Sequence, residues 1–537
     1  MRIKGAMFFQ SIRTSFIIMF LLYFAGSTWA LENEQAPIIP LKGAINSIKA
    51  EHVTTGMLYD KVVPLSEIHL FDGRAEAKTL DLIRWKQIFF ELKKSSIKKP
   101  FLPAFESLKE RARHKYMARG VIPIAILDLK YNTIKKEIQV SDAEYESGLK
   151  TREFSASDFD KNHVFAASTL KPSTWRGEKV IFVLDPSYYF SNKNRPGGSI
   201  QIDFGDGKGS RQVEFGENIS VSYASTGEKT VSLTAVNEEG NPLVSRFIFD
   251  VRSLSTPDPQ ETWNIQSELP YQGETASGRA YIYRADDHPD LVSPVIVVEG
   301  FDMFNSMGWD EFYGYMNRED MLEKMRCRGR DLVVLDFDNS IDYLQRNAFL
   351  LVRLIEIINA KESLQTPLVI AGACMGGLVA RYALAYMEQM GIDHNTRTFI
   401  SFDVPHQGAN IPLGLQHWVQ FFSEHSAQAE EMLEMLKSPA ARQMLIYHSL
   451  QTDGTDASCD PQKTAFINDI NGLGGYPKNL RKVAIANGSG YGQGLAFNPG
   501  DQLIRYEYSG GLVFLDLVFL LKLLEMPGLF LIVHLRL

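Results

Sequence analysis

The chain has few cysteines, three in 537 residues: Cys327, Cys374 and Cys459. Three cysteines in a chain of this length do not form a disulfide framework, so a packed core must hold the fold together. Cys327 and Cys459 could pair and leave Cys374 free, or all three could stay reduced, because pairing depends on geometry that a sequence does not give. A hydrophobic content of 45% and a charged content of 22% are ordinary for globular protein and argue against extensive disorder.

The sequence also lacks a block of basic residues. Its 56 Lys and Arg residues are outnumbered by 64 Asp and Glu residues, which gives a formal net charge of -8. Nucleic acids are bound chiefly through clustered cations that neutralise phosphates. We therefore expect no nucleic-acid partner.

No apolar run near the N-terminus is long enough to span a membrane. The run at residues 16–26 is 11 residues long, whereas a spanning helix needs about 20. It follows a basic stretch and precedes small residues that end at Ala30. This order predicts a signal peptide over residues 1–30, and hence a secreted, periplasmic or cell-surface protein. An uncleaved membrane anchor is the alternative.

Common metal-binding patterns are missing, since the sequence has no His-x-x-x-His pair and no paired-cysteine spacing. Glycines alternate over residues 488–494, but no helical pattern follows them to present a phosphate-binding N-terminus. We therefore expect neither a metal ion nor a cofactor.

Residues 31–165 contain no chemical motif. Residues 80–92 have the apolar spacing of a helix, and residues 121–129 have the composition of a strand. We interpret this region as an accessory module that packs on the segments after it.

Residues 170–253 consist of short alternating runs separated by turn residues, which predicts an all-β, immunoglobulin-like sandwich. The segments 203–207, 223–227 and 231–237 resemble motifs of the PKD domain, in that family's order. PKD domains are common in exported bacterial enzymes, so the resemblance implies a spacer, or a contact with a surface or polysaccharide. Asp203 and Asp206 could hold Ca²⁺, but acidic residues are also common simply because they form turns.

From residue 257 to 537, near-continuous apolar runs alternate with helical patterns. This order predicts a doubly wound, mostly parallel α/β sheet that is covered on both faces. The expected strands are residues 294–298, 331–335, 367–371, 398–402 and 481–486. Helices are expected at residues 343–359 and 378–390, and the insertion at 413–450 has helical spacing too.

The most informative motif is Gly-Ala-Cys-Met-Gly-Gly at residues 372–377, which follows an apolar strand and opens a helix. It resembles the G-x-S-x-G nucleophile elbow of the α/β-hydrolase superfamily, to which lipases and esterases belong. The resemblance implies that Cys374 is the nucleophile in place of serine. A thiol at a helix N-terminus has a lowered pKa, so we expect a thiolate.

The resemblance also implies an oxyanion hole and a lid. The hole's donors would be the backbone N–H groups of Met375, after the nucleophile, and of Phe301, in the loop after the third strand. Gly300 would let that loop turn inward. The insertion at residues 413–450 could be a lid, although ordinary packed helices explain its pattern as well.

The acid and the base of a catalytic triad are open at this point. Residues 401–408 resemble the Pro-His-x-Gly segment of lipases and of GPI-inositol deacylases, which makes Asp403 or, in the next loop, Asp501 the candidate acid. His406 and His534 are the candidate bases. In the lipases that the segment resembles, however, the histidine that corresponds to His406 is structural. The apolar stretch from residue 511 could be a buried last helix, or the chain could end before a loop that carries the true histidine.

Together these features predict an exported acyl hydrolase of carboxylic esters or thioesters that works through an acyl-cysteine. The alternative is a non-catalytic surface-binding or scaffold protein that keeps the hydrolase fold.

Overall fold

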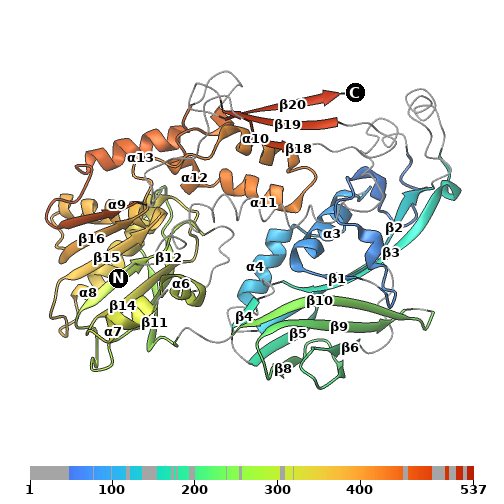
Figure 1. Cartoon of the computed structure of the whole chain (residues 1–537), viewed down its shortest axis with the longest axis horizontal. Coiled ribbons are helices and arrows are strands. Elements are labelled where there is room, and N and C mark those ends of the chain that lie inside the picture. Colours follow the sequence, from blue (N-terminus) through green and yellow to red (C-terminus); the bar gives the residue numbers. More distant parts are fainter. Residues whose placement is uncertain are drawn as a thin grey trace, which may run out of the picture.

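A computed structural model describes most of the chain from residue 48 onward (Figure 1). The described residues are 48–76, 78–97, 100–115, 121–135, 154–170, 174–176, 179–192, 200–237, 239–252, 257–302, 309–317, 320–451, 458–486, 502–506, 516–523 and 529–536. The predicted signal peptide, Asp501 and the alternating glycines lie outside them.

The N-terminal half contains two β-sheets that share one core. One sheet has the strand order β3-β2-β5-β8, and the other has the order β1-β10-β9-β6-β7 with β4 beside β10. The rings of Phe182 in β5 and Phe249 in β10 lie 5.2 Å apart, so the sheets face each other. The strands are β1 (Thr79–Leu80), β2 (Val121–Ile134), β3 (Phe159–Thr169), β4 (Thr174–Arg176), β5 (Lys179–Ser191), β6 (Ile200–Asp203), β7 (Ser210–Val213), β8 (Asn218–Ser222), β9 (Gly227–Val236) and β10 (Pro242–Arg252).

The segment that we interpreted as an accessory module contributes to this core. β2 lies between β3 and β5, antiparallel to the first and parallel to the second. Nearly every residue of β2 is buried, because a central strand of a covered sheet packs on both faces. β2 and β3 therefore share one sheet with β5 and β8 of the next segment, and the resemblance of residues 170–253 to a PKD domain stays a prediction.

Two helices flank this half. Helix α3 (Leu82–Lys94) is capped by Asp81, whose side chain accepts a hydrogen bond from the Arg84 N–H. The helix buries Trp85 and Phe89 in the shared core. Helix α4 (Phe105–Lys115) follows it. Short 3₁₀ turns lie at Tyr59–Lys61, Ile68–Phe71, Ala156–Asp158 and Ser449–Gln451.

The C-terminal half is built on a mixed sheet with the order β11-β12-β14-β13-β15-β16-β17. The pairs from β14 through β17 are parallel, whereas β11, β12 and β14 pair antiparallel. This confirms the predicted mostly parallel α/β sheet, with the cysteine-bearing β15 inside it. The strands are β11 (Glu261–Gln266), β12 (Ser277–Tyr283), β13 (Pro294–Val298), β14 (Asp331–Phe337), β15 (Leu368–Ala373), β16 (Thr396–Phe402) and β17 (Arg481–Ile485).

Helices cover both faces of this sheet, as the burial of every residue of β13 requires. Ile296 and Val298 pack in one core with α8 (Leu344–Asn359) and α9 (Met375–Gln389). Val295 and Val297 pack in another core with α6 (Trp309–Met316) and α7 (Met321–Arg326). Full burial of an aliphatic side chain contributes about 1.5–3 kcal/mol, so these layers fix the sheet firmly.

The insertion between β16 and β17 is helical, as its spacing predicts. It comprises α10 (Leu413–Phe422), α11 (Ala427–Leu436), α12 (Pro439–Met444) and α13 (Pro461–Gly472). Helix α11 lies against α3 of the other half (Figure 1). Lys86 of α3 forms a buried ion pair with Glu431, and the Gln87 amide bonds the His425 carbonyl oxygen at 2.9 Å. The two halves therefore meet through the insertion.

The apolar C-terminal stretch contains strands rather than the helix that we considered. β18 (Gln502–Tyr506), β19 (Asp516–Leu523) and β20 (Leu529–Arg536) form an antiparallel sheet, and β20 lies beside α10 (Figure 1). Short apolar runs fit either structure by pattern alone. Among the helices of the described residues, none has the length and apolarity to cross a membrane.

Candidate active site

Cys374 lies on the sharp turn between β15 and α9, with φ 51° and ψ −125°. A non-glycine residue at positive φ is strained by about 1–3 kcal/mol, and such strain is concentrated at functional sites. The strand, strained turn and helix are the setting that the sequence predicts for a nucleophile elbow.

Two glycines of the motif let the elbow pack closely on its neighbours. A Cβ at Gly376 would contact the carbonyl oxygen of Glu299, and one at Gly377 would contact the Val404 side chain. Any larger residue at either position would push α9 away from the end of β13 or of β16.

The two predicted oxyanion donors converge on the thiol. The backbone N–H groups of Met375 and Phe301 both lie near enough to Cys374 to lower the pKa of its thiol. Gly300 makes room for this approach, because a Cβ there would lie 3.2 Å from the Ala373 carbonyl oxygen and 3.4 Å from Cys374 Cβ. An acyl group attached to Sγ would therefore have two N–H donors beside its carbonyl oxygen.

The thiol's electrostatics differ from our expectation of a thiolate. Burial raises the pKa of Cys374, the N–H groups of Met375 and Phe301 lower it, and the negative charge of Asp403 raises it. Burial is the largest of these effects, so the resting group is the neutral thiol. A base is then needed to activate it.

Asp403 lies directly after β16, on the same edge of the sheet as Cys374. It is half-buried, has φ 49°, and donates its backbone N–H to the Ile485 carbonyl oxygen at 2.7 Å. Its charge acts on the Cys374 thiol. The structure thus brings one candidate acid to the elbow; the other candidate, Asp501, lies outside the described residues.

His406 forms its side-chain hydrogen bond with a serine of β16. Its Nε2 hydrogen-bonds to Ser401 Oγ at 2.8 Å, and within the described residues its buried Nδ1 has no partner. Burial and then the nearby Arg381 charge lower the pKa of His406 to about 4, so the ring is neutral. The rings of His406 and Tyr476 pack edge to face, with 5.5 Å between their centroids. Within the described part of the chain, no hydrogen bond, ion pair or ring contact is seen between His406 and Cys374.

His534, the other candidate base, lies on β20 with Val518 of β19 as its register partner. β20 runs beside α10, so this histidine belongs to the strands that border the insertion. Its role as a base stays a prediction.

Phe301 joins the elbow to the insertion. Its side chain packs against the core of the sheet and also against an apolar cluster of the insertion. That cluster contains Val419, Met432, Leu436, Ala441 and Leu445, with Ala409, Ile411, Leu415, Trp418 and Leu433 at its margin. The side of the site next to the oxyanion loop is therefore apolar.

The sequence left open whether Cys327 and Cys459 pair and whether Asp203 and Asp206 hold Ca²⁺. Cys327, Cys374 and Cys459, all in the described part of the chain, are unpaired.

Asp206 pairs with Arg211 at 2.8 Å, and Asp203 accepts the Gly205 N–H at 2.9 Å. In the described residues no group of three or more His, Cys, Asp or Glu side chains could hold a metal ion. The bonds of Asp203 and Asp206 lie within the turn and the strand after it.

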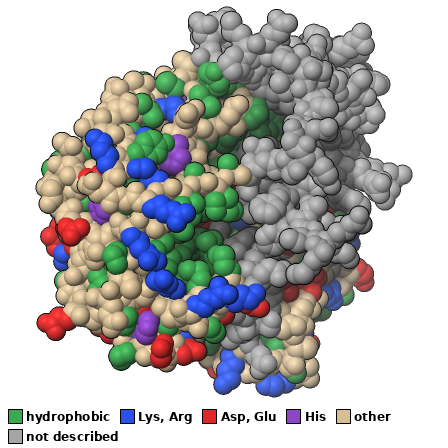
Figure 2. Space-filling model, turned by 60° about the vertical axis from the view of Figure 1, so that its left-hand side comes forward, with side chains coloured by type: hydrophobic (Ala, Val, Ile, Leu, Met, Phe, Trp, Pro, Cys, Tyr) green, Lys and Arg blue, Asp and Glu red, His purple; other side chains and the backbone are tan. Residues whose placement is uncertain are grey.

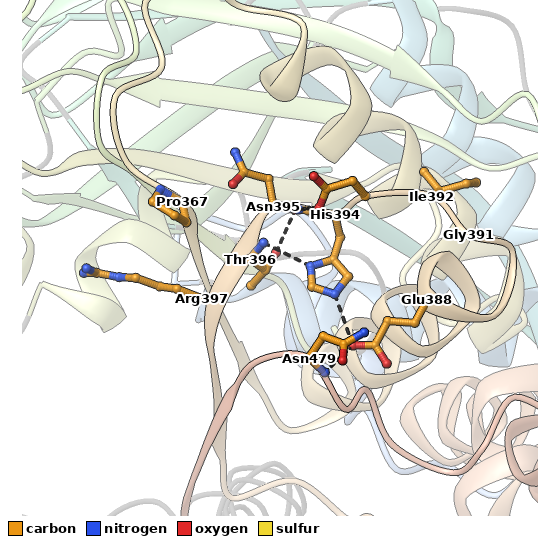
Figure 3. Close-up of a pocket in the computed structure, with 10 residues that line it drawn as sticks. Pro367, Glu388, Gly391, Ile392, His394, Asn395, Thr396, Arg397 and Asn479 are labelled. Atoms are coloured by element: carbon orange, nitrogen blue, oxygen red, sulfur yellow. Dashed lines mark hydrogen bonds and ion pairs between the residues drawn. The ribbon is translucent and has the colours of Figure 1, made fainter.

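A surface pocket of about 440 Å³ lies where β15 and β16 begin, at the end of these strands opposite Cys374 (Figure 3). Its polar groups bond to one another: Glu388 accepts the Asn479 N–H at 2.7 Å, and His394 Nδ1 accepts the Thr396 N–H at 3.0 Å. Since Thr396 begins β16 and Cys374 lies at the other end of the neighbouring strand, this pocket is remote from the elbow.

The face on the side of the α/β sheet carries hydrophobic side chains near its centre with Lys and Arg beside them (Figure 2). Asp and Glu side chains lie mostly toward the margin of the same view. The charge on this face is mixed.

Comparison with known proteins finds no matching family model and no matching curated protein. Among solved structures, the chain is similar to an esterase from Pyrobaculum calidifontis, at 14% identity and a TM-score of 0.25, over 43% of this chain and 77% of that one. Est1E from Butyrivibrio proteoclasticus matches at 14% identity and a TM-score of 0.22, over 42% and 88% of the two chains. A brefeldin A esterase, described as a bacterial homologue of human hormone-sensitive lipase, matches at 12% identity and a TM-score of 0.25, over 43% and 70%.

Proposed function

We propose that the protein is an exported acyl hydrolase of the α/β-hydrolase type that cleaves carboxylic esters or thioesters through an acyl-cysteine. The observation that carries the proposal is the convergence of the Met375 and Phe301 N–H groups on Cys374 Sγ at a strained elbow. An elbow with two backbone donors aimed at its nucleophile is the arrangement that acyl transfer requires.

In this reaction a base removes the Sγ proton and sulfur forms a bond to the acyl carbon. The carbonyl oxygen takes up the negative charge and accepts hydrogen bonds from Phe301 and Met375. Collapse of this intermediate breaks the bond to the leaving alcohol or thiol, which takes the proton. Water then attacks the acyl carbon, gives up a proton, and releases the acid and the free thiol.

Asp403 is the proposed acid, because its charge already acts on the thiol. Of the two histidines suggested by the sequence, His406 is engaged by Ser401, so the proposal keeps His534 as the base. The apolar cluster around Phe301 favours substrates with an apolar acyl group.

The test compares hydrolysis of p-nitrophenyl esters by the wild type, Cys374→Ala and Cys374→Ser. Cys459→Ser is the matched control, because Cys459 is also a partly buried free thiol. We expect loss of hydrolysis in Cys374→Ala and full activity in Cys459→Ser. Equal hydrolysis by the wild type and Cys374→Ala would refute the proposal.

A second candidate function is a non-catalytic scaffold. It is favoured by the raised pKa of the Cys374 thiol and by the engagement of His406 elsewhere. The two candidates separate in a labelling experiment with an acyl-directed thiol probe, since only the hydrolase should be labelled selectively at Cys374.

Export and surface contact are proposals that rest on the sequence. N-terminal sequencing of the mature protein should begin at Leu31 if residues 1–30 are cleaved. The sandwich is proposed as a spacer or surface-binding module. Binding of the intact protein to insoluble polysaccharide, measured by sedimentation with and without a soluble competitor, tests the second role.

A further inference from the structure

The loop that carries Phe301 is held on both sides by the neighbouring strand and the turn after it. Residues 299–302 follow β13, and β14 pairs with β13 in parallel. One buried side chain fixes the start of this loop and another fixes its end, with Phe301 between them.

Glu299 fixes the start. Its side chain is 3% exposed, and its Oε2 accepts the Phe337 N–H at 2.8 Å. Its own backbone N–H donates to the Leu335 carbonyl oxygen at 3.1 Å, and its carboxyl group hydrogen-bonds to Asp336. The main chain and side chain of Glu299 are thus both attached to the end of β14.

Ser340 fixes the end. Its buried Oγ accepts the Asp302 N–H at 3.3 Å and donates to the Asp302 carbonyl oxygen at 3.1 Å. The turn that bears Ser340 is itself anchored, because Asn347 Nδ2 donates to the Asn339 carbonyl oxygen at 3.1 Å and the Ala440 N–H donates to that of Ile341 at 3.1 Å. The peptide of Asp302 is therefore tied to the helices α8 and α12.

We infer that Glu299 and Ser340 are positioning residues, which hold the Phe301 N–H in line with Cys374 Sγ and so preserve the oxyanion hole. The inference rests on the proposed hydrolase function. Only Gly300 separates Phe301 from Glu299, and Phe301 is followed directly by Asp302, whose peptide bonds Ser340. An oxyanion donor must be placed to within a fraction of an ångström, so these two anchors determine where the Phe301 N–H lies.

The carboxyl of Glu299 acts in its protonated form. Burial, and then the negative charges of Asp336 and Asp302, raise the pKa of Glu299 well above its usual range. The proton lets Glu299 donate to Asp336 while its other oxygen accepts from Phe337. Ionised, Glu299 would add a negative charge behind the place where the oxyanion develops, and it would repel both Asp336 and the reacting oxygen.

Other charged groups face this cluster from neighbouring elements. Arg279 and Tyr281 of β12 interact with Asp336, and Lys109 of α4 interacts with Asp302. The positive charges of Arg279 and Lys109 offset part of the negative charge of the two aspartates. Loss of the Glu299 proton would add a negative charge to this cluster as the pH rises.

The test uses the full chain with Ser340→Ala, Glu299→Ala and Glu299→Gln. Ser293→Ala is the matched control, because Ser293 is also buried and its Oγ bonds Thr366 Oγ1 at 2.8 Å, but at the other end of β13. We expect kcat to fall about 10- to 100-fold in Ser340→Ala and Glu299→Ala, with KM changed less than about threefold.

Glu299→Gln is the conservative rescue. Its amide oxygen can accept from Phe337 and its NH₂ can donate to Asp336, so kcat at neutral pH should stay within about threefold of the wild type. The decline of wild-type kcat at alkaline pH should be absent from Glu299→Gln. The inference is overturned if Glu299→Gln loses as much activity as Glu299→Ala, or if Ser340→Ala loses no more than Ser293→Ala.

A second measurement does not depend on turnover. The Phe301 N–H lowers the pKa of the Cys374 thiol, so a displaced loop should shift the pH dependence of Cys374 alkylation by iodoacetamide toward higher pH in Ser340→Ala and not in Ser293→Ala. An unchanged alkylation profile in Ser340→Ala would overturn the positioning role. A different result would refute the proposed hydrolase function itself: the wild type would then hydrolyse esters no faster than Cys374→Ala.

Discussion

Substitution of Gly376 by alanine should disrupt the proposed oxyanion hole without changing Cys374, the proposed nucleophile. A Cβ at this position would lie 2.5 Å from the Val298 carbonyl oxygen and would also contact that of Glu299. Carbon–oxygen contacts in proteins normally exceed about 3.3 Å. The first turn of α9, which carries the Met375 N–H, must therefore move by about 1 Å from the end of β13, which leads into the Phe301 loop.

We expect Gly376→Ala to lose about 1–3 kcal/mol of unfolding free energy through overpacking, and about 100-fold in kcat through misplacement of the two donors. Gly472→Ala is the control, because nothing lies within 4 Å of a Cβ there and alanine is the better helix former. Urea denaturation and p-nitrophenyl ester hydrolysis measure the two effects. Wild-type stability and activity in Gly376→Ala would refute the close packing on which the elbow depends.

Three further outcomes follow from the burial and charge of single groups. Burial raises the pKa of Glu91 to about 7, so this group stabilises the fold fully below pH 4.5 and loses that contribution as the pH rises through 7. In urea denaturation, the wild type should lose about 3 kcal/mol of unfolding free energy across this pH range. Glu91→Gln should show no such loss. Asp403→Asn should lower the pKa of Cys374 and speed its alkylation while slowing ester hydrolysis, and slower alkylation would contradict the assigned charge effect. His406→Gln should keep kcat within about threefold, because its amide can still bond Ser401; a loss as large as that of Cys374→Ala would instead make His406 the base.

The elements that sequence reasoning predicted well are those whose pattern is local. β13 occupies residues 294–298 in both the prediction and the structure, because a run buried on both faces is apolar at every position. The elbow was equally clear, since the glycines at 376 and 377 are dictated by close approach of backbone and side chain.

Elements that depend on distant partners were not predicted. β11 and β12 pair at the edge of the sheet, and their alternating, partly polar runs do not stand out from loops. β2 was expected in a separate module, but the pairing with β5 that draws it into the sandwich is decided by the tertiary fold. The C-terminal strands were ambiguous because a short apolar run is compatible with a helix or a strand.

The candidate site shows the same division. Cys374, Met375 and Phe301 follow from the motif and its fold context, whereas the raised pKa of the thiol comes from burial that no motif encodes. His406 has a suitable place in the sequence, but its ring turns to Ser401. The carboxyl of Glu299 has no motif, and only the structure reveals its bond to the Phe337 N–H.

The most direct measurement of the central claim is mass spectrometry of the protein after brief mixing with a p-nitrophenyl ester. The account predicts one acyl group per chain, on the peptide that contains Cys374, sensitive to hydroxylamine and lost again as the acid is released. Cys374→Ala should carry none. Release of p-nitrophenol without acylation of Cys374, or an adduct on another residue with Cys374 unmodified, would contradict the account.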